Sequence, residues 1–178
     1  MYRDNTLIPS EAIRLLALGL LAEGPRSYAQ LAQGVREFLQ LVVGPSLDLL
    51  APPLELLKIE GLVGAEGVGS TATLTLSPTG AEELQRLLAA NLRAPTTDIS
   101  KLILALKVRF LPLLPPAEQR LQAEMMAEVF QRARARLLEL RERAPAGPAF
   151  GGWLAMELDK AERQLAWAQD LQRQLGGT

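Results

Sequence analysis

Residues 61–80 read GLVGAEGVGSTATLTLSPTG, with runs of apolar and β-branched residues on either side of a glycine-rich turn. This pattern predicts a β-hairpin with a glycine-tolerant bend. A hairpin that follows a short helix is typical of the wing of a winged helix-turn-helix. Wings commonly contact nucleic-acid phosphates, yet Glu66 is the only charged residue in this stretch, and its sign is unfavourable for such a contact. The stretch therefore predicts a fold and leaves open what the wing does.

The first of three helices is expected upstream of the hairpin. Residues 10–25 read SEAIRLLALGLLAEGP, with Ser10 as a candidate N-cap and Gly24 at the end of the apolar periodicity. Leu15 and Leu18 add apolar side chains to the second face, so this helix is apolar on nearly all sides. We expect it to be covered on both sides, and a partner subunit could supply the second cover.

Two further helices complete the predicted order. Ser27 is a candidate N-cap for the second helix, which should turn near Gly44. The third helix is expected within residues 47–61, LDLLAPPLELLKIEG. It should begin near Pro52 because proline is tolerated in the first helical turn, which leaves residues 46–51 as a short turn or helix end of their own. A fourth helix follows the hairpin. The order of helix, helix, helix, strand, strand and helix predicts a mostly α-helical fold with a winged helix-turn-helix head.

The composition excludes most enzyme chemistry. The 178 residues include neither cysteine nor histidine, which removes thiol nucleophiles, imidazole acid-base catalysis and the usual zinc ligands. We therefore expect no catalytic residues, no metal and no cofactor. The first apolar run is interrupted by Glu11 and Arg14, and no apolar stretch reaches membrane-spanning length. We expect a soluble, cytoplasmic protein that does not bind a membrane.

Charge differs between two predicted domains. We assign residues 1–93 to the winged helix-turn-helix domain and residues 94–178 to a helical C-terminal dimerisation domain. The first carries seven basic and ten acidic side chains, a balance of −3, which is poor for a DNA-binding head. The second carries twelve basic and ten acidic side chains, a balance of +2, with an arginine cluster on a helix where glutamates are interleaved.

The C-terminal half is predicted to be helical throughout. One helix should begin at Thr97 or Asp98 as its cap and end at the prolines that follow. A long helix is expected over residues 116–143, then a linker over residues 144–152 and a last helix. The expected apolar stripe of the long helix consists of Leu121, Met125, Val129, Ala133, Leu137 and Leu140.

The last helix carries aromatic residues, some at coiled-coil spacing, so it needs a partner groove. The residues expected to need this groove are Trp153, Met156, Ala161, Leu165, Trp167 and Leu171. The candidate ligand pocket or dimer seam is formed by Phe110, Trp153, Met156 and Trp167. These residues could wall an aromatic ligand pocket at a dimer interface, or form a dry core or seam.

Three stretches in the head together resemble the PadR family of bacterial transcriptional regulators. They are ALGLLAEGPRSYAQLAQGV at 17–35, LELLKIEGLV at 54–63 and LTLSPTGAEEL at 74–84. Residues 101–125 and 153–175 resemble the C-terminal helices of the subgroup with a long C-terminal domain. The resemblance implies a homodimer in which the C-terminal helices clasp the neighbour's first helix, with wings and recognition helices facing double-stranded DNA. It also implies that a small-molecule effector relieves repression in some members.

The chain departs from the family at positions that contact DNA. Ala51 occupies the usual tyrosine position, and Glu55 stands where a basic residue is frequent. The wing has residues 69–72, GSTA, where arginine and lysine are common. The remaining candidate DNA contacts are Arg3, Arg26, Ser27, Gln30, Gln33, Ser46, Lys58, Thr71 and Thr73. Each could instead be a helix cap or an ordinary solvated residue, and we expect any DNA binding to be weak.

Two functions remain open. The first is a PadR-like DNA-binding regulator, which the resemblance along the whole chain favours. The second is a protein-interaction module that has lost most or all DNA binding and uses its third helix and wing, which the charge of the head favours. The apolar third helix, with Leu49 and Leu50, would then present a protein-binding patch. We rank the regulator first.

Overall fold

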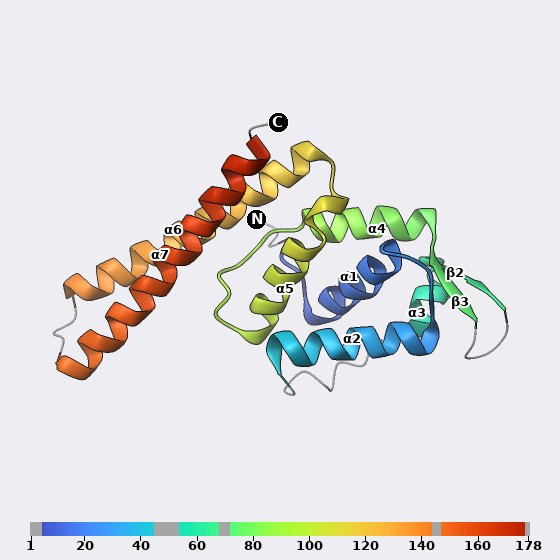
Figure 1. Cartoon of the computed structure of the whole chain (residues 1–178), viewed down its shortest axis with the longest axis horizontal. Coiled ribbons are helices and arrows are strands. Elements are labelled where there is room, and N and C mark those ends of the chain that lie inside the picture. The colour runs from blue at the N-terminus through green and yellow to red at the C-terminus, as the bar shows by residue number, and fades with distance from the viewer. Residues whose placement is uncertain (1–4, 45–53, 68–71, 144–146, 177–178) are drawn as a thin grey trace. The chain divides into compact units, whose positions relative to one another are not determined.

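The computed structural model describes residues 5–44, 54–67, 72–143 and 147–176 (Figure 1). The elements are α1 (Pro9–Ala22), β1 (Arg26–Ser27), α2 (Tyr28–Val43), α3 (Leu54–Ile59), β2 (Val63–Glu66), β3 (Thr73–Leu76), α4 (Pro78–Ala89), α5 (Asp98–Arg109), a 3-10 turn (Leu111–Leu113), α6 (Pro116–Arg143) and α7 (Pro148–Gly176). The predicted fold class is confirmed: a winged helix-turn-helix head is followed by helices.

The chain forms two compact units. The first comprises Met1–Asn91 with Pro95–Leu114, and the second comprises Leu92–Ala94 with Pro115–Thr178. Helix α5 therefore packs with the first unit. The predicted domain boundary, after residue 93, instead assigns this helix to the C-terminal domain. The division into domains at residues 93 and 94 stays a prediction.

Helix α1 is the centre of the first unit. It packs against α2, α4, α5 and β3 of the same unit, and Figure 1 shows these helices around it. From Ala12 to Leu21 every side chain except that of Arg14 is buried. The expectation that this helix is covered on both sides is confirmed, and elements of its own unit supply the cover that a partner subunit could have given.

The start of α1 also differs from the prediction. Pro9 occupies the first helical turn, where its missing N–H is no loss, and Ile8 is the N-cap residue. The carboxylate of Glu11 accepts a hydrogen bond from the backbone N–H of Ile8 at 3.0 Å. Ser10 is consequently inside the helix and is not its cap.

The described strands form one antiparallel sheet in the order β1-β3-β2. The hairpin predicted over residues 61–80 is β2 and β3, with Val63 opposite Leu76 and Glu66 opposite Thr73. Strand β1 was not predicted, because two residues are too short to show an alternating pattern. It adds a third strand that leads directly into α2.

The described part of the third helix is short. Helix α3 spans Leu54–Ile59, and Leu54 and Leu57 point into the core. The third helix was predicted within residues 47–61, with its start near Pro52. Pro52, Leu49 and Leu50 lie outside the described residues. The helix ends as expected before Gly61, whose φ of 71° suits glycine.

The second unit consists mainly of α6 and α7, which pack along each other. Its buried residues are Leu92, Leu154, Leu158, Ala161, Ala168, Gln122, Ala123, Met126, Ala127, Val129 and Phe130. The stripe predicted for the long helix is wrong in part, since Leu121 and Leu140 are exposed. Trp153, Met156 and Trp167 of α7 are also exposed, and the partner groove expected for them stays a prediction. Helix α7 also begins at Pro148, inside the predicted linker.

A buried lysine closes the end of α4. The side chain of Lys107 on α5 is 1% exposed, and its Nζ donates to the carbonyl oxygens of Leu88 and Ala90, each at 2.5 Å. These carbonyls lie at the C-terminus of α4, where they lack helical partners. Loss of water around the amine disfavours its charged form, and burial lowers the pKa of Lys107 to about 7.

We expect the stability of the protein to respond to pH through Lys107. Between the folded pKa of about 7 and the ordinary value of 10.5, the unfolded chain binds more protons. The free energy of unfolding should therefore rise with pH in this window. Urea titrations of wild type and Lys107→Met at pH 6 to 10 check this. As the pH rises, the free energy of unfolding of wild type should increase relative to that of Lys107→Met. A difference that does not vary with pH would contradict it.

Candidate nucleic-acid interface

The residues where α3 meets the wing, Glu60–Leu62, form what we call the α3–wing junction. Two motifs of the sequence, IEGLV at 59–63 and LSPTG at 76–80, meet here. Ser77 donates its hydroxyl to the carbonyl oxygen of Gly61 at 2.7 Å, and its backbone N–H donates to Leu62 O at 3.1 Å. The same hydroxyl accepts from the N–H of Gly80 and caps α4. One serine thus fixes both the junction and the start of α4.

Gly80 leaves the space that this contact needs. A Cβ at Gly80 would lie 2.0 Å from Leu62 O and 2.9 Å from the side chain of Leu76. The first of these neighbours is backbone and cannot move without shifting the junction. The glycine of the LSPTG motif is therefore required by packing between α4 and the junction.

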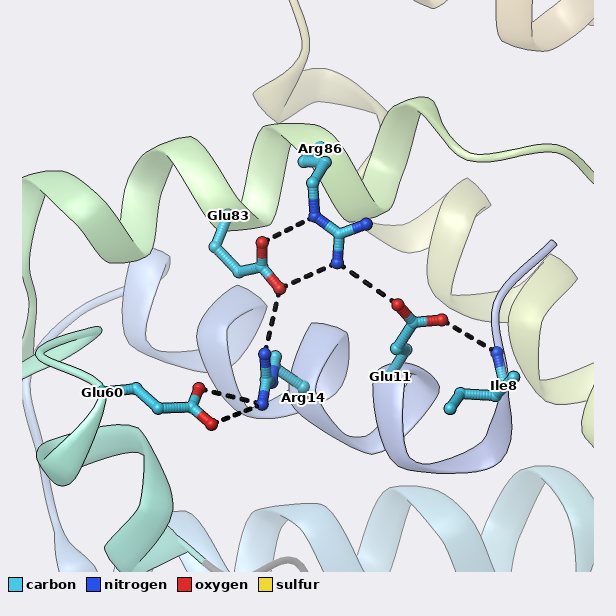
Figure 2. A network of polar contacts seen from close by, with 6 residues as sticks. All are labelled: Ile8, Glu11, Arg14, Glu60, Glu83 and Arg86. Carbon is cyan, nitrogen blue, oxygen red and sulfur yellow. Dashed lines mark hydrogen bonds and ion pairs between the residues drawn. The ribbon is translucent and has the colours of Figure 1, made fainter. Parts of the chain in front are cut away.

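A network of charged side chains joins α1, α3 and α4 (Figure 2). Arg14 on α1 contacts both carboxylate oxygens of Glu60 at 2.9 Å and one oxygen of Glu83 on α4 at 3.2 Å. Arg86 on α4 donates to Glu83 at 2.7 and 2.9 Å and contacts Glu11 at 3.3 Å. The hydrogen bond from Arg86, followed by that from Arg14, lowers the pKa of Glu83 below its ordinary value, so this carboxylate stays charged near neutral pH.

The predicted DNA contacts around β1 are engaged by the fold. Ser27 and Gln30 form a capping box at the start of α2, in which each side chain pairs with the other residue's backbone N–H at 3.2 and 2.8 Å. Arg26 donates to the carbonyl oxygen of Leu20 at 3.0 Å and to Glu23 at 3.1 Å. These groups hold α1, β1 and α2 together.

The other described candidates are more open. Gln33 is exposed on α2 and donates to Glu37 at 2.7 Å. Thr73 is exposed on β3. Lys58 is half-buried, with its Nζ 3.9 Å from Glu55 and 5.9 Å from the centre of the Tyr28 ring. These positions lie on α2, α3 and β3, which belong to the first unit, and their role in DNA binding stays a prediction.

Three candidates, Arg3, Ser46 and Thr71, lie outside the described residues. Sequence reasoning passed over Arg36, which is exposed on α2 three residues after Gln33. Within the part of the chain that the structure describes, Arg36 has no carboxylate partner. Residues three positions apart lie on the same face of a helix, so the spacing of Arg36 from Gln33 could have identified Arg36 as a further candidate.

The candidate aromatic pocket is divided between the units. Phe110 is buried in the first unit against Gly19, where a Cβ would come within 2.5 Å of its ring. Trp153, Met156 and Trp167 belong to α7 in the second unit and are exposed. Trp167 meets the Phe130 ring edge-on at 6.4 Å. Neither unit by itself assembles the four residues into a pocket, and their roles stay a prediction.

Comparison with known proteins gives one family match, described as "Putative AphA-like transcriptional regulator", over residues 2–172. This confirms the predicted kind of family, which is one of transcriptional regulators and not of enzymes. No curated protein sequence matches significantly. Among the described helices, none is both long and apolar enough to span a bilayer.

Solved structures of Bacillus subtilis PadR are similar to the chain at 20% sequence identity. The complex with p-coumaric acid covers 96% of this chain and 99% of its own, with a TM-score of 0.40. The complex with operator DNA covers 92% and 98%, with a TM-score of 0.37. A further PadR crystal structure covers 96% and 98%, with a TM-score of 0.40.

We expect Gly80→Ala to destabilise the first unit by about 2 kcal/mol, because the added methyl group must displace the backbone at Leu62. Gly34→Ala on α2 is the matched control, since its Cβ would meet only a Leu20 methyl group at 3.4 Å. Alanine in a helix should there raise stability, by up to about 1 kcal/mol. Chemical denaturation followed by circular dichroism measures both, and equal effects of the two substitutions would contradict this account.

Proposed function

We propose that this chain, which belongs to the AphA-like family of transcriptional regulators, is a cytoplasmic, homodimeric regulator whose winged helix-turn-helix head binds double-stranded DNA. The observation that supports DNA binding most is the arrangement of α2, α3 and the β2–β3 hairpin around one small sheet. Relief of DNA binding by a small-molecule effector is the part of the proposal that rests on the resemblance to PadR regulators alone.

Weak DNA binding is expected from the charges of the head. Arg14, Arg26 and Arg86 each contact carboxylates, and Lys58 lies near Glu55. A cation that is paired within the protein contributes less to the release of counterions from DNA. Arg36 is exposed without such a pair in the described part of the head, so it should supply a large share of the electrostatic affinity.

Support for the homodimer comes from α7. A pair of helices has one shared seam, and α7 buries Leu154, Leu158, Ala161 and Ala168 there. A second flank of α7, defined by Trp153, Met156 and Trp167 at helical spacing, stays exposed, with Trp153 and Met156 at 45% and 56%. A second copy of the chain would cover these side chains by forming a four-helix arrangement.

A second candidate function is a protein-interaction module. On α3, Leu56 and Ile59 are exposed, the latter at 79%, beside the exposed Glu55 and Glu60. An apolar and acidic outer face suits a protein better than a phosphate backbone. Absence of duplex binding at low salt would favour this function over DNA binding.

The first experiment measures the anisotropy of a labelled duplex over a salt series. We expect a shallow dependence of log affinity on log salt, on the order of two to four charges per dimer at about 0.9 each. Arg36→Ala and Lys58→Ala should weaken binding on all sequences. Arg36→Ala should reduce the slope by about one per DNA-contacting subunit, and Lys58→Ala should reduce it by less because its amine lies near Glu55.

Lys101→Ala is the matched control, because Lys101 lies at the start of α5 and pairs with Asp98. It should leave affinity and slope unchanged. If no duplex binds at any concentration in low salt, DNA binding is excluded for this head. If Lys101→Ala weakens binding as much as Arg36→Ala, the assignment of Arg36 is wrong.

The second experiment measures mass by light scattering at micromolar concentration. Wild type should be a dimer, and Trp153→Lys combined with Met156→Lys should shift it to monomer because charges would enter the apolar flank of α7. Leu41→Lys, an equally non-conservative change at an exposed apolar position of α2, should leave the dimer intact. A monodisperse wild-type monomer would rule out the proposed assembly.

A further inference from the structure

Arg14 is the only polar side chain between Ala12 and Leu21, and every neighbour in that stretch of α1 is buried. We propose that Arg14 is a positioning residue for DNA binding: by holding Glu60 it fixes the α3–wing junction to the central helix. This inference rests on the proposed function, since it assumes that α3 and the wing contact DNA together.

The contact is built from several directions. One terminal nitrogen of Arg14 reaches both oxygens of Glu60 at 2.9 Å, and the other reaches Glu83 at 3.2 Å (Figure 2). Glu83 is itself held by Arg86 from the same helix. The guanidinium is therefore held between α4 and the residue that follows α3, so two elements define its position.

The position of Glu60 explains why this contact matters. Glu60 directly follows α3 and precedes Gly61, whose positive φ turns the chain into the wing. Ser77 fixes the backbone of Gly61 and Leu62 from the α4 side, and Arg14 fixes the side chain of Glu60 from α1. Together they set the direction in which α3 ends and β2 begins.

Positioning and simple electrostatics predict opposite signs for one substitution. Removing the negative charge of Glu60 should strengthen DNA binding if the carboxylate acts only through repulsion of phosphates. If Arg14 fixes the α3–wing junction through its contact with Glu60, the same change should weaken DNA binding. The sign of the effect therefore separates the two explanations without a precise magnitude.

The test compares wild type with Glu60→Ala, Arg14→Gln and the double variant. DNA affinity is measured by anisotropy, and backbone hydrogen exchange is followed at Leu62 and Ser77, whose N–H groups bond across the junction. We expect each single variant to weaken DNA binding by about fivefold and to speed exchange at both amides. The double variant should bind DNA no more weakly than Arg14→Gln alone, because both substitutions remove the same contact, that between Arg14 and Glu60.

Glu55→Ala is the matched control, since it removes a neighbouring exposed carboxylate of α3 that does not contact Arg14. It should leave exchange unchanged and leave DNA binding equal or stronger. Equal or tighter binding by Glu60→Ala, or unchanged exchange at Leu62 and Ser77 in the Arg14 variant, overturns the inference. If wild type binds no duplex, the proposed function fails, and the positioning role for DNA fails with it. If wild type binds and Glu60→Ala binds with unchanged affinity, only the positioning role is overturned.

Discussion

The burial of α1 on all sides is the constraint on which the first unit depends. A helix with nine buried residues out of fourteen must be surrounded by α2, α4, α5 and β3, so these elements can take few alternative positions around it. Gly19 shows how tight this packing is, because the Phe110 ring occupies the space that a Cβ would need. Arg14 is the exception in the buried stretch, and its guanidinium leads to the surface between α3 and α4.

The local signals in the sequence predicted the fold well. Ser27 and Thr97 are the N-caps of α2 and α5 as expected, and Gly61 ends α3 with a positive φ. Each of these signals acts within a few residues along the chain and needs no knowledge of distant partners. Strand β1 was missed because its two residues pair with β3, 48 and 46 positions further along, and carry no pattern of their own.

The candidate site was harder to predict. Contacts with residues far along the chain decide which of its polar side chains pair within the fold and which stay exposed. Arg14 pairs with carboxylates 46 and 69 residues away, and no spacing rule predicts such pairs. Arg26 reads in the sequence as a basic residue at a helix start, but in the structure it holds the end of α1. Arg36 looked no different from it, yet is exposed. Candidate residue types for DNA contact can be identified from the sequence, while the fold decides which of these side chains are available.

The second unit illustrates a related limit. Helices α6 and α7 each carry apolar residues on more than one flank, and a pair of helices can bury only one flank of each against the other. Small buried residues such as Ala161 and Ala168 allow the close approach of α7, while Trp153 is 45% exposed and Trp167 meets the Phe130 ring edge-on and stays 40% exposed. Side-chain size alone would have placed the tryptophans in the seam. Their exposure leaves large apolar side chains gathered on one flank of α7, and such side chains are stabilised when another surface removes them from water.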